Sequence, residues 1–354
     1  MRIRFTLVVG LTCALAAPAT AGAATKVVTM GTPPAAQKTF QKAFSDVNAF
    51  FPTSVTIAAG DSVRFAPAGF HTADLPPRGG RAQPLFVPGA PVAGAVDPAG
   101  APFWFNGQPS LGFNPALLRS GFGKRFAYTG ARRVNTGLPV QDRPKPMTVR
   151  FPRAGTYTYF CDVHPGMKGT VRVRAASAAV PTARADARRV RKQTSDALKV
   201  ATALADTTPP AGAVNVGASG RGGVERFAFF PATLTVPVGT TLRFQMTQAT
   251  REVHTATTGP GDPEKEPTSF LGQLTASLDG PAPNPAVFYP SDPPPAPANL
   301  APTAHGNGFW NSGVMDVVSA TPLPPANLVR FAAAGTYQYY CLIHPFMHAT
   351  ITVQ

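Results

Sequence analysis

The sequence predicts an all-β protein built as two tandem β-sandwiches that a helical linker joins. Three observations favour this fold class: a long internal repeat, short segments in which apolar and polar residues alternate, and many chain breakers between them. The chain has 354 residues, of which 40 are proline and 33 are glycine. Val, Thr, Phe and Tyr dominate the segments between these breakers, which is typical of short strands separated by turns.

The internal repeat covers the strand-forming parts of the chain. FFPTSVTIAAGDSVRF at residues 50–65 matches FFPATLTVPVGTTLRF at residues 229–244. VRFPRAGTYTYFC at residues 149–161 matches VRFAAAGTYQYYC at residues 329–341. Two copies of one unit within a chain predict two domains with the same fold.

The matched blocks set the expected domain boundaries. We expect one domain over residues 25–175, a linker over residues 176–211 and a second domain over residues 212–354. Strand periodicity recurs within each domain, as at Val171 and Val173, which alternate with arginines. Alternation of this kind indicates half-buried antiparallel strands, and hence a sandwich of two sheets.

The linker differs from the rest of the chain in composition. Between residues 183 and 206 it contains Ala, Leu, Arg and Lys but neither Gly nor Pro, which predicts a helix. We expect a solvated helix packed on one domain; binding of lipid or a partner by its basic face is the alternative. The expected apolar stripe consists of Val190, Ala197, Leu198, Ala201 and Leu204.

Two long proline-rich insertions interrupt the repeat, at residues 75–142 and 259–299. We expect them to wrap over the sandwiches. The stretch PSDPPPAPANLAP at residues 290–302 should form neither strand nor helix, because proline lacks a donor and fixes φ.

The first 24 residues have the order of a secretory signal peptide. Arg2 and Arg4 precede the apolar run FTLVVGLTCALAA, and the small residues PATAGA follow it. A membrane anchor is the alternative, but the apolar run is short for a bilayer. We therefore expect an exported protein, periplasmic or extracellular.

The charge of the chain is strongly basic, with 32 Lys and Arg against 17 Asp and Glu. Removing Arg2 and Arg4 leaves 30 against 17, a formal charge of +13. Such a balance favours an acidic protein or a membrane surface as partner. Nucleic acid is not expected, because the sequence contains no recognition motif for it.

Two cysteines remain after the signal peptide, Cys161 and Cys341, and a disulfide between them is one interpretation. Each, however, begins the pattern Cys-x-x-His-Pro-x-Met, which follows an aromatic strand and an upstream His-Thr-Ala. One thiolate and two imidazoles form a trigonal set to which a thioether can add a weak axial bond, as in blue copper sites. Zinc could also bind such ligands. The predicted ligands are His71, Cys161, His164 and Met167 in the first domain, and His254, Cys341, His344 and Met347 in the second.

At these residues the sequence resembles the cupredoxins, specifically the plastocyanin, amicyanin and pseudoazurin group. CLIHPFM at residues 341–347 is similar to the short ligand loop of amicyanin, and CDVHPGM at residues 161–167 has the same length. The resemblance implies a Greek-key sandwich, two type 1 copper sites, and one-electron transfer through an exposed histidine, here His164 and His344. Members of the group commonly have Asn after the first histidine ligand. Here Thr72 and Thr255 occupy that place.

Two cupredoxin units in one chain also resemble multicopper oxidases and copper nitrite reductases, which need further histidines. The residues that flank the two cysteines are Phe160, Asp162, Tyr340 and Leu342, and only His305 and His348 remain after the predicted ligands. We therefore expect no enzyme but an electron carrier between a donor and an acceptor. Copper buffering or delivery is the alternative function, and a mainly structural cell-surface module is a third. His305 and His348 are interpreted as polar loop residues, with a weak extra copper site as the alternative.

Overall fold

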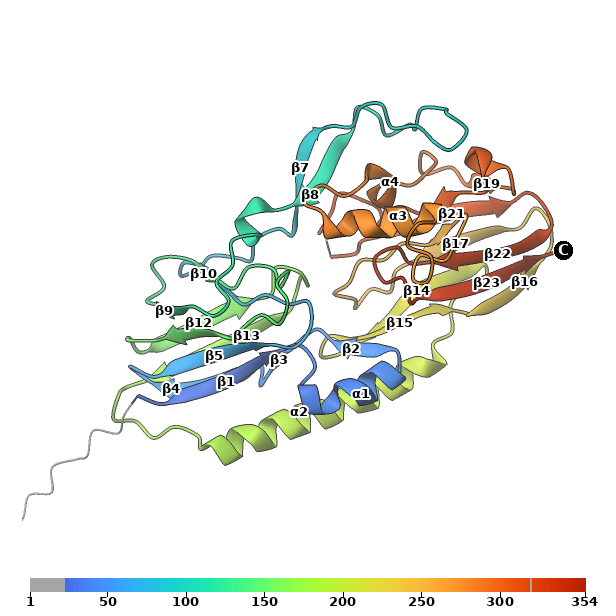
Figure 1. Ribbon diagram of the computed structural model, residues 1–354. Coiled ribbons are helices and arrows are strands. Elements are labelled where there is room, and N and C mark those ends of the chain that lie inside the picture. The colour runs from blue at the N-terminus through green and yellow to red at the C-terminus, as the bar shows by residue number, and fades with distance from the viewer. Residues whose placement is uncertain (1–22, 319) are drawn as a thin grey trace, which may run out of the picture.

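The computed structural model describes residues 23–318 and 320–354 (Figure 1). The signal peptide predicted for residues 1–24 lies outside the described residues, apart from its last two. Within the described part of the chain, no helix combines the length and the apolar composition needed to cross a bilayer.

The first sandwich consists of two five-stranded sheets that enclose one apolar core. Phe50 and Phe65 pack edge-on against Tyr159 in this core, with ring centroids 4.6 and 5.0 Å apart. One sheet has the order β3 (Phe50–Phe51), β1 (Thr25–Met30), β5 (Ser62–Pro67), β11 (Met147–Arg150) and β9 (Arg125–Ala127). The other has the order β10 (Val134–Asn135), β6 (Asp74–Leu75), β12 (Gly155–Phe160), β13 (Lys168–Arg174) and β4 (Ser54–Ala58).

The second sandwich repeats this core at the positions that the sequence repeat matches. Phe229 and Phe244 pack edge-on against Tyr339, with centroids 4.7 and 5.2 Å apart. One sheet has the order β19 (Ala298–Leu300), β21 (Ala326–Phe331), β17 (Thr241–Gln245), β14 (Ala213–Gly220), β15 (Val224–Phe230) and β2 (Ser45–Val47). The other has the order β16 (Thr233–Val236), β23 (His348–Val353), β22 (Gly335–Tyr340), β18 (Thr257–Thr258) and β20 (Trp310–Asn311). The all-β fold class predicted from the sequence is confirmed.

One strand crosses between the halves of the chain. β2, which precedes the first repeat block, pairs antiparallel with β15 and becomes the edge of a sheet in the second sandwich. Pairing satisfies backbone groups that β15 would otherwise leave open. The strand pattern of the sequence does not predict this crossing, because it specifies a strand but not the strand with which it pairs.

The predicted linker helix is α2 (Ala183–Ala203), which continues into the short η2 (Leu204–Asp206). The side chain of Thr182 caps its first turn by accepting from the N–H of Ala185. All five residues of the expected apolar stripe belong to a cluster with α1 (Pro34–Lys42) and strands β2, β3 and β15. The helix therefore contacts both sandwiches and not one domain alone, because it packs on β3 of the first sandwich and on β15 of the second.

The two insertions form a third apolar cluster, which joins the halves. The first contains a hairpin of β7 (Phe86–Pro91) and β8 (Pro109–Phe113), followed by η1 (Pro115–Leu117). This hairpin reaches across to α3 (Phe270–Ala276), η3 (Ser277–Asp279) and α4 (Pro285–Phe288) of the second insertion (Figure 1).

The proline-rich stretch at residues 290–302 departs from the prediction. It contains β19, which pairs parallel with β21. No proline lies between Pro297 and Pro302, so the N–H groups of the three residues of β19 are free to pair.

Candidate metal centres

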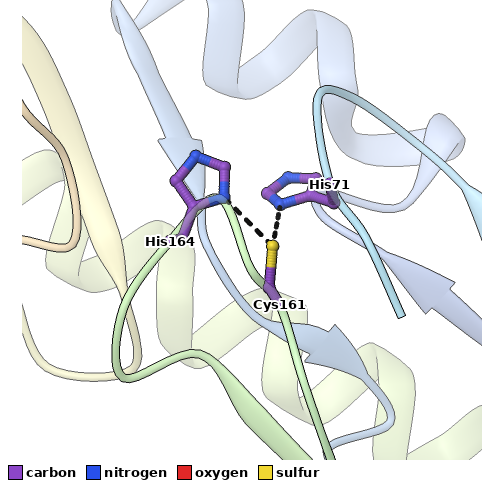
Figure 2. Close-up of side chains that lie close together, drawn as sticks. All are labelled: His71, Cys161 and His164. Atoms are coloured by element: carbon purple, nitrogen blue, oxygen red, sulfur yellow. Dashed lines mark hydrogen bonds between the residues drawn. The ribbon is translucent and has the colours of Figure 1, made fainter. Parts of the chain in front are cut away.

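The first predicted ligand set converges from two separate loops. Cys161 directly follows β12, His164 lies in the turn before β13, and His71 lies between β5 and β6. The Sγ atom of Cys161 is 3.9 Å from Nδ1 of His71 and 3.5 Å from Nδ1 of His164. Figure 2 shows both imidazole rings turned toward the sulfur. All three side chains are buried.

The second set has the same arrangement. Sγ of Cys341 is 3.7 Å from Nδ1 of His254 and 3.7 Å from Nδ1 of His344, and the two nitrogens are 3.0 Å apart. The order of elements is also the same, since Cys341 follows β22 and His344 lies in the turn before β23. The two halves thus gather equivalent donor atoms.

The spacing of the donor atoms fits a single ion at each set. A metal–sulfur bond of about 2.3 Å and a metal–nitrogen bond of about 2.0 Å, opened by about 110–120°, place sulfur and nitrogen about 3.5–3.7 Å apart. The sulfur–nitrogen distances here are 3.5, 3.9, 3.7 and 3.7 Å. Thiolate with two imidazoles is a donor set for copper or zinc.

The two methionines close the ligand turns through their backbones. Met167 donates its N–H to the carbonyl of His164 and accepts from the N–H of Cys161, each at 3.0 Å. Met347 repeats both bonds, and both side chains are fully buried. These bonds fix each turn in one shape. A thioether bond to the ion remains a prediction.

The threonines that replace the expected asparagine stabilise both ligand segments. The N–H of Thr72 lies 3.4 Å from Sγ of Cys161, and its hydroxyl accepts from the N–H of Asp162 at 2.7 Å. In the second half, Thr255 does the same toward Cys341 and the N–H of Leu342. Backbone N–H groups directed at sulfur favour the thiolate. The hydroxyl ties the upstream histidine segment to the cysteine turn.

Two glycines that the sequence analysis missed make room for the upstream histidines. Gly31 follows β1 with φ of 95°, and Gly217 lies in β14 with φ of 80°. A Cβ at Gly31 would lie 2.4 Å from Nε2 of His71, and one at Gly217 would lie 2.8 Å from Nε2 of His254. Any larger residue would push the imidazole away, so only glycine fits both the backbone and the ring.

Glu252 is the most informative residue that the sequence analysis missed. Its Oε1 lies 3.1 Å from Nε2 of His164, and its Oε2 lies 3.8 Å from Nε2 of His344. The two histidines expected to be exposed are instead turned toward each other across this carboxylate, with side chains 7% and 18% exposed. The repeat has Gly69 at the matching position, so a break in the repeat two residues before a ligand was the available signal.

Charges near the two sets shift their pKa values differently. Burial disfavours ionisation at Cys161, but the charge of His164 and hydrogen bonds outweigh it and hold the thiol pKa well below its ordinary value. Burial raises the pKa of Cys341. The charges of Glu252 and Cys161 outweigh burial and raise the pKa of His164, whereas burial lowers the pKa of His344. The pKa values of the two histidines shift in opposite directions because Glu252 lies closer to His164 than to His344.

A cavity of about 780 Å³ lies where the two halves meet, and residues of both ligand sets line it. Its walls are rich in phenylalanine, including Phe113, Phe227 and Phe346. The outer edges of His164 and His344 therefore line this cavity between the halves, together with Glu252.

The remaining candidate residues have other surroundings. Cys161 and Cys341 are both free, so the alternative of a disulfide between them does not hold. His305 contacts Asp97 at 3.0 Å and Asp292 at 3.3 Å. His348 is exposed on β23. Among the described residues, neither histidine belongs to a cluster of potential metal ligands.

Comparison with known proteins gives matches only among solved structures. No protein-family model and no curated protein matches the chain. A mutant of amicyanin in its reduced Cu(I) form at pH 4 is 17% identical, with a TM-score of 0.22, over 43% of this chain and 89% of that one. Amicyanin from Paracoccus versutus (Thiobacillus versutus) is 16% identical, with the same score, over 43% and 88%. The fold described above rests on the sheets of this chain and not on these similarities.

Proposed function

We propose that this chain is an exported, two-domain blue copper protein that transfers single electrons through two mononuclear type 1 sites. The residues that would hold each ion are those predicted from the sequence, including the methionine of each turn. Bound copper would supply reversible one-electron chemistry, and the chain would supply two imidazoles and a thiolate in a fixed, buried arrangement.

The observation that supports this proposal is the duplication of one buried donor set. His-Cys-His groups whose donor atoms lie within 4.8 Å of one another occur in both halves. A sandwich core on one side and a hydrogen-bonded turn on the other hold each set, so its geometry would change little between oxidation states. Soft sulfur ligands favour copper over harder ions.

Burial of the donors favours the electron carrier over a protein that buffers or delivers copper. Cys161 is 1% exposed and Cys341 is fully buried, so an ion held there could not exchange easily with a second protein. The histidine supply argues against an oxidase or nitrite reductase, since His305 is occupied by two aspartates.

The proposed partners are a redox donor and acceptor in the periplasm or outside the cell. The basic composition favours acidic partners or a membrane surface. His164 and His344 are 7% and 18% exposed and line the cavity between the halves, so we propose that a partner approaches them through this cavity.

Copper loading tests the proposed function. We expect the wild type to bind two copper ions per chain, with intense sulfur-to-copper absorption and a type 1 paramagnetic resonance signal. Cys161→Ser and Cys341→Ser should each lose one copper, and the double variant should lose both. Copper that binds without sulfur, or a wild type that binds none, would refute the proposal.

A further inference from the structure

We propose that Glu252 couples the two candidate copper centres, so that an electron passes between them inside the chain along His164, Glu252 and His344. This inference rests on the proposed function and specifies how its two sites work together. One centre is oxidised as the other is reduced, and no bond is formed or broken.

The geometry gives a nearly continuous path. In each of these histidines Nδ1 faces the cysteine of its own set, while Nε2 faces the carboxylate. The route from ring to ring therefore runs through the covalent bonds of two imidazoles and one carboxylate. Only two through-space steps remain, of 3.1 Å and 3.8 Å. Electronic coupling decays far more steeply through space than through bonds, so such a short route favours internal transfer.

Both halves hold the carboxylate in place. Asn48, from the first half of the chain, donates its Nδ2 to Oε1 of Glu252 at 2.6 Å. The guanidinium of Arg251 donates to the carbonyl of Asn48 at 2.5 Å, and the N–H of Asn48 donates to the carbonyl of Gly223. Because Glu252 is only 8% exposed, a charge at this depth needs partners, and the two histidines with Asn48 are those partners.

Glu252 should also give the two centres different reduction potentials. Oε1 lies closer to His164 than Oε2 lies to His344. A negative charge stabilises the more positive, oxidised state of a nearby ion, and the effect decreases with distance. The charge of Glu252 should therefore lower the reduction potential of the first centre more than that of the second. This difference favours electron flow from the first centre to the second.

Three variants distinguish a role of Glu252 in electron transfer from a general effect on the protein. Glu252→Ala removes the path, and Glu252→Gln keeps its shape but removes its charge. Glu264→Gln changes a carboxylate that also lines the cavity but is exposed and contacts neither histidine. All three variants are made in a parent protein that carries Met347→Gln. This change should give the second centre a distinct spectrum and potential, because the axial ligand tunes both.

The first measurement is copper content and absorption. If the wild type does not hold two sulfur-bound coppers, the proposed function fails, and the inference that rests on it fails with it. If they are present, pulse reduction of a fraction of the centres should be followed by redistribution between them, at a rate independent of protein concentration. Glu252→Ala should slow this step at least tenfold, and Glu264→Gln should leave it unchanged. Equal rates in the parent and in Glu252→Ala would overturn the inference, as would the absence of redistribution.

Potentials supply a second readout, which a merely structural role would not move. Glu252→Gln should raise the potentials of both centres in a redox titration followed by paramagnetic resonance, and the first more than the second. Redistribution in this variant should stay within threefold of the parent, since the path is intact. Unchanged potentials, or a larger shift at the second centre, would contradict the geometry.

Discussion

Replacing Thr72 by valine tests whether a threonine hydroxyl holds the first centre together. The hydroxyl accepts from the N–H of Asp162 at 2.7 Å and donates to its carboxylate at 3.0 Å, and Thr72 is fully buried. Valine has almost the same shape, so it removes both bonds without leaving a cavity. A buried N–H without an acceptor costs about 1–3 kcal/mol, and the lost bond to the carboxylate adds about 1 kcal/mol. We expect Thr72→Val to lower the free energy of unfolding by about 2–4 kcal/mol.

The assay combines urea unfolding, followed by circular dichroism, with the reactivity of the Cys161 thiol in a Cys341→Ser background. If the cysteine turn opens locally, 2 kcal/mol corresponds to a rise of about 30-fold in thiol reactivity. Thr72→Ser keeps the hydroxyl and loses one methyl group, so it should cost about 1 kcal/mol and leave the thiol protected.

The matching variant in the second half gives an internal comparison. Thr255→Val removes the acceptor for the N–H of Leu342 and a hydrogen bond of 3.0 Å with the hydroxyl of Thr257, where Thr72 has a bond to a carboxylate. Because a hydrogen bond between neutral groups is weaker than one to a charged group, Thr255→Val should cost less than Thr72→Val. An unfolding free energy of Thr72→Val within 0.5 kcal/mol of the wild type, with unchanged thiol reactivity, would refute the reasoning.

Three further predictions concern other parts of the structure. Burial raises the pKa of Glu225 from 4.5 to about 8, so the folded state keeps a proton that the unfolded state releases. The free energy of unfolding should therefore fall as pH rises from about 4.5 to 8, by up to about 1.4 kcal/mol per pH unit, and in urea unfolding Glu225→Gln should depend less on pH than the wild type. Gly217→Ala should reduce copper content from two ions to one, because the new Cβ would lie 2.8 Å from His254, while Gly212→Ala, at φ of 73° with open space around it, should keep both. Phe105→Ala should cost about 3–5 kcal/mol in urea unfolding, because this fully buried ring packs the insertion hairpin onto the second half, and a cost below 1 kcal/mol would show that the hairpin is not docked.

The local part of each centre follows directly from the sequence. A strand that ends at Cys161 and turns through His164 to Met167 can close in only a few ways, because proline and hydrogen bonds restrict the turn. The second copy of this pattern identified His71 and His254 as equivalent positions. The helix at Ala183–Ala203 was likewise predictable, since its apolar stripe has helical period.

The pairing of β2 with the second sandwich and the docking of the insertion hairpin could be seen only in the tertiary structure. A strand pattern such as Ser45–Val47 specifies which side chains face a core, but any open sheet edge of suitable length can satisfy its backbone. The proline-rich insertions have no periodicity, so the contacts between the hairpin of the first insertion and α4 of the second depend on shapes that form only when both halves have folded.

By itself the sequence determined the sandwich class, the duplication and the residues of each His-Cys-His set, because these depend on periodicity and on short, repeated spacings. Only the tertiary structure decided that the two sets face each other and that Glu252 lies between them. A single glutamate belongs to no repeat or period, and its role exists only because the packing of two halves brings His164 and His344 to the two oxygens of one carboxylate.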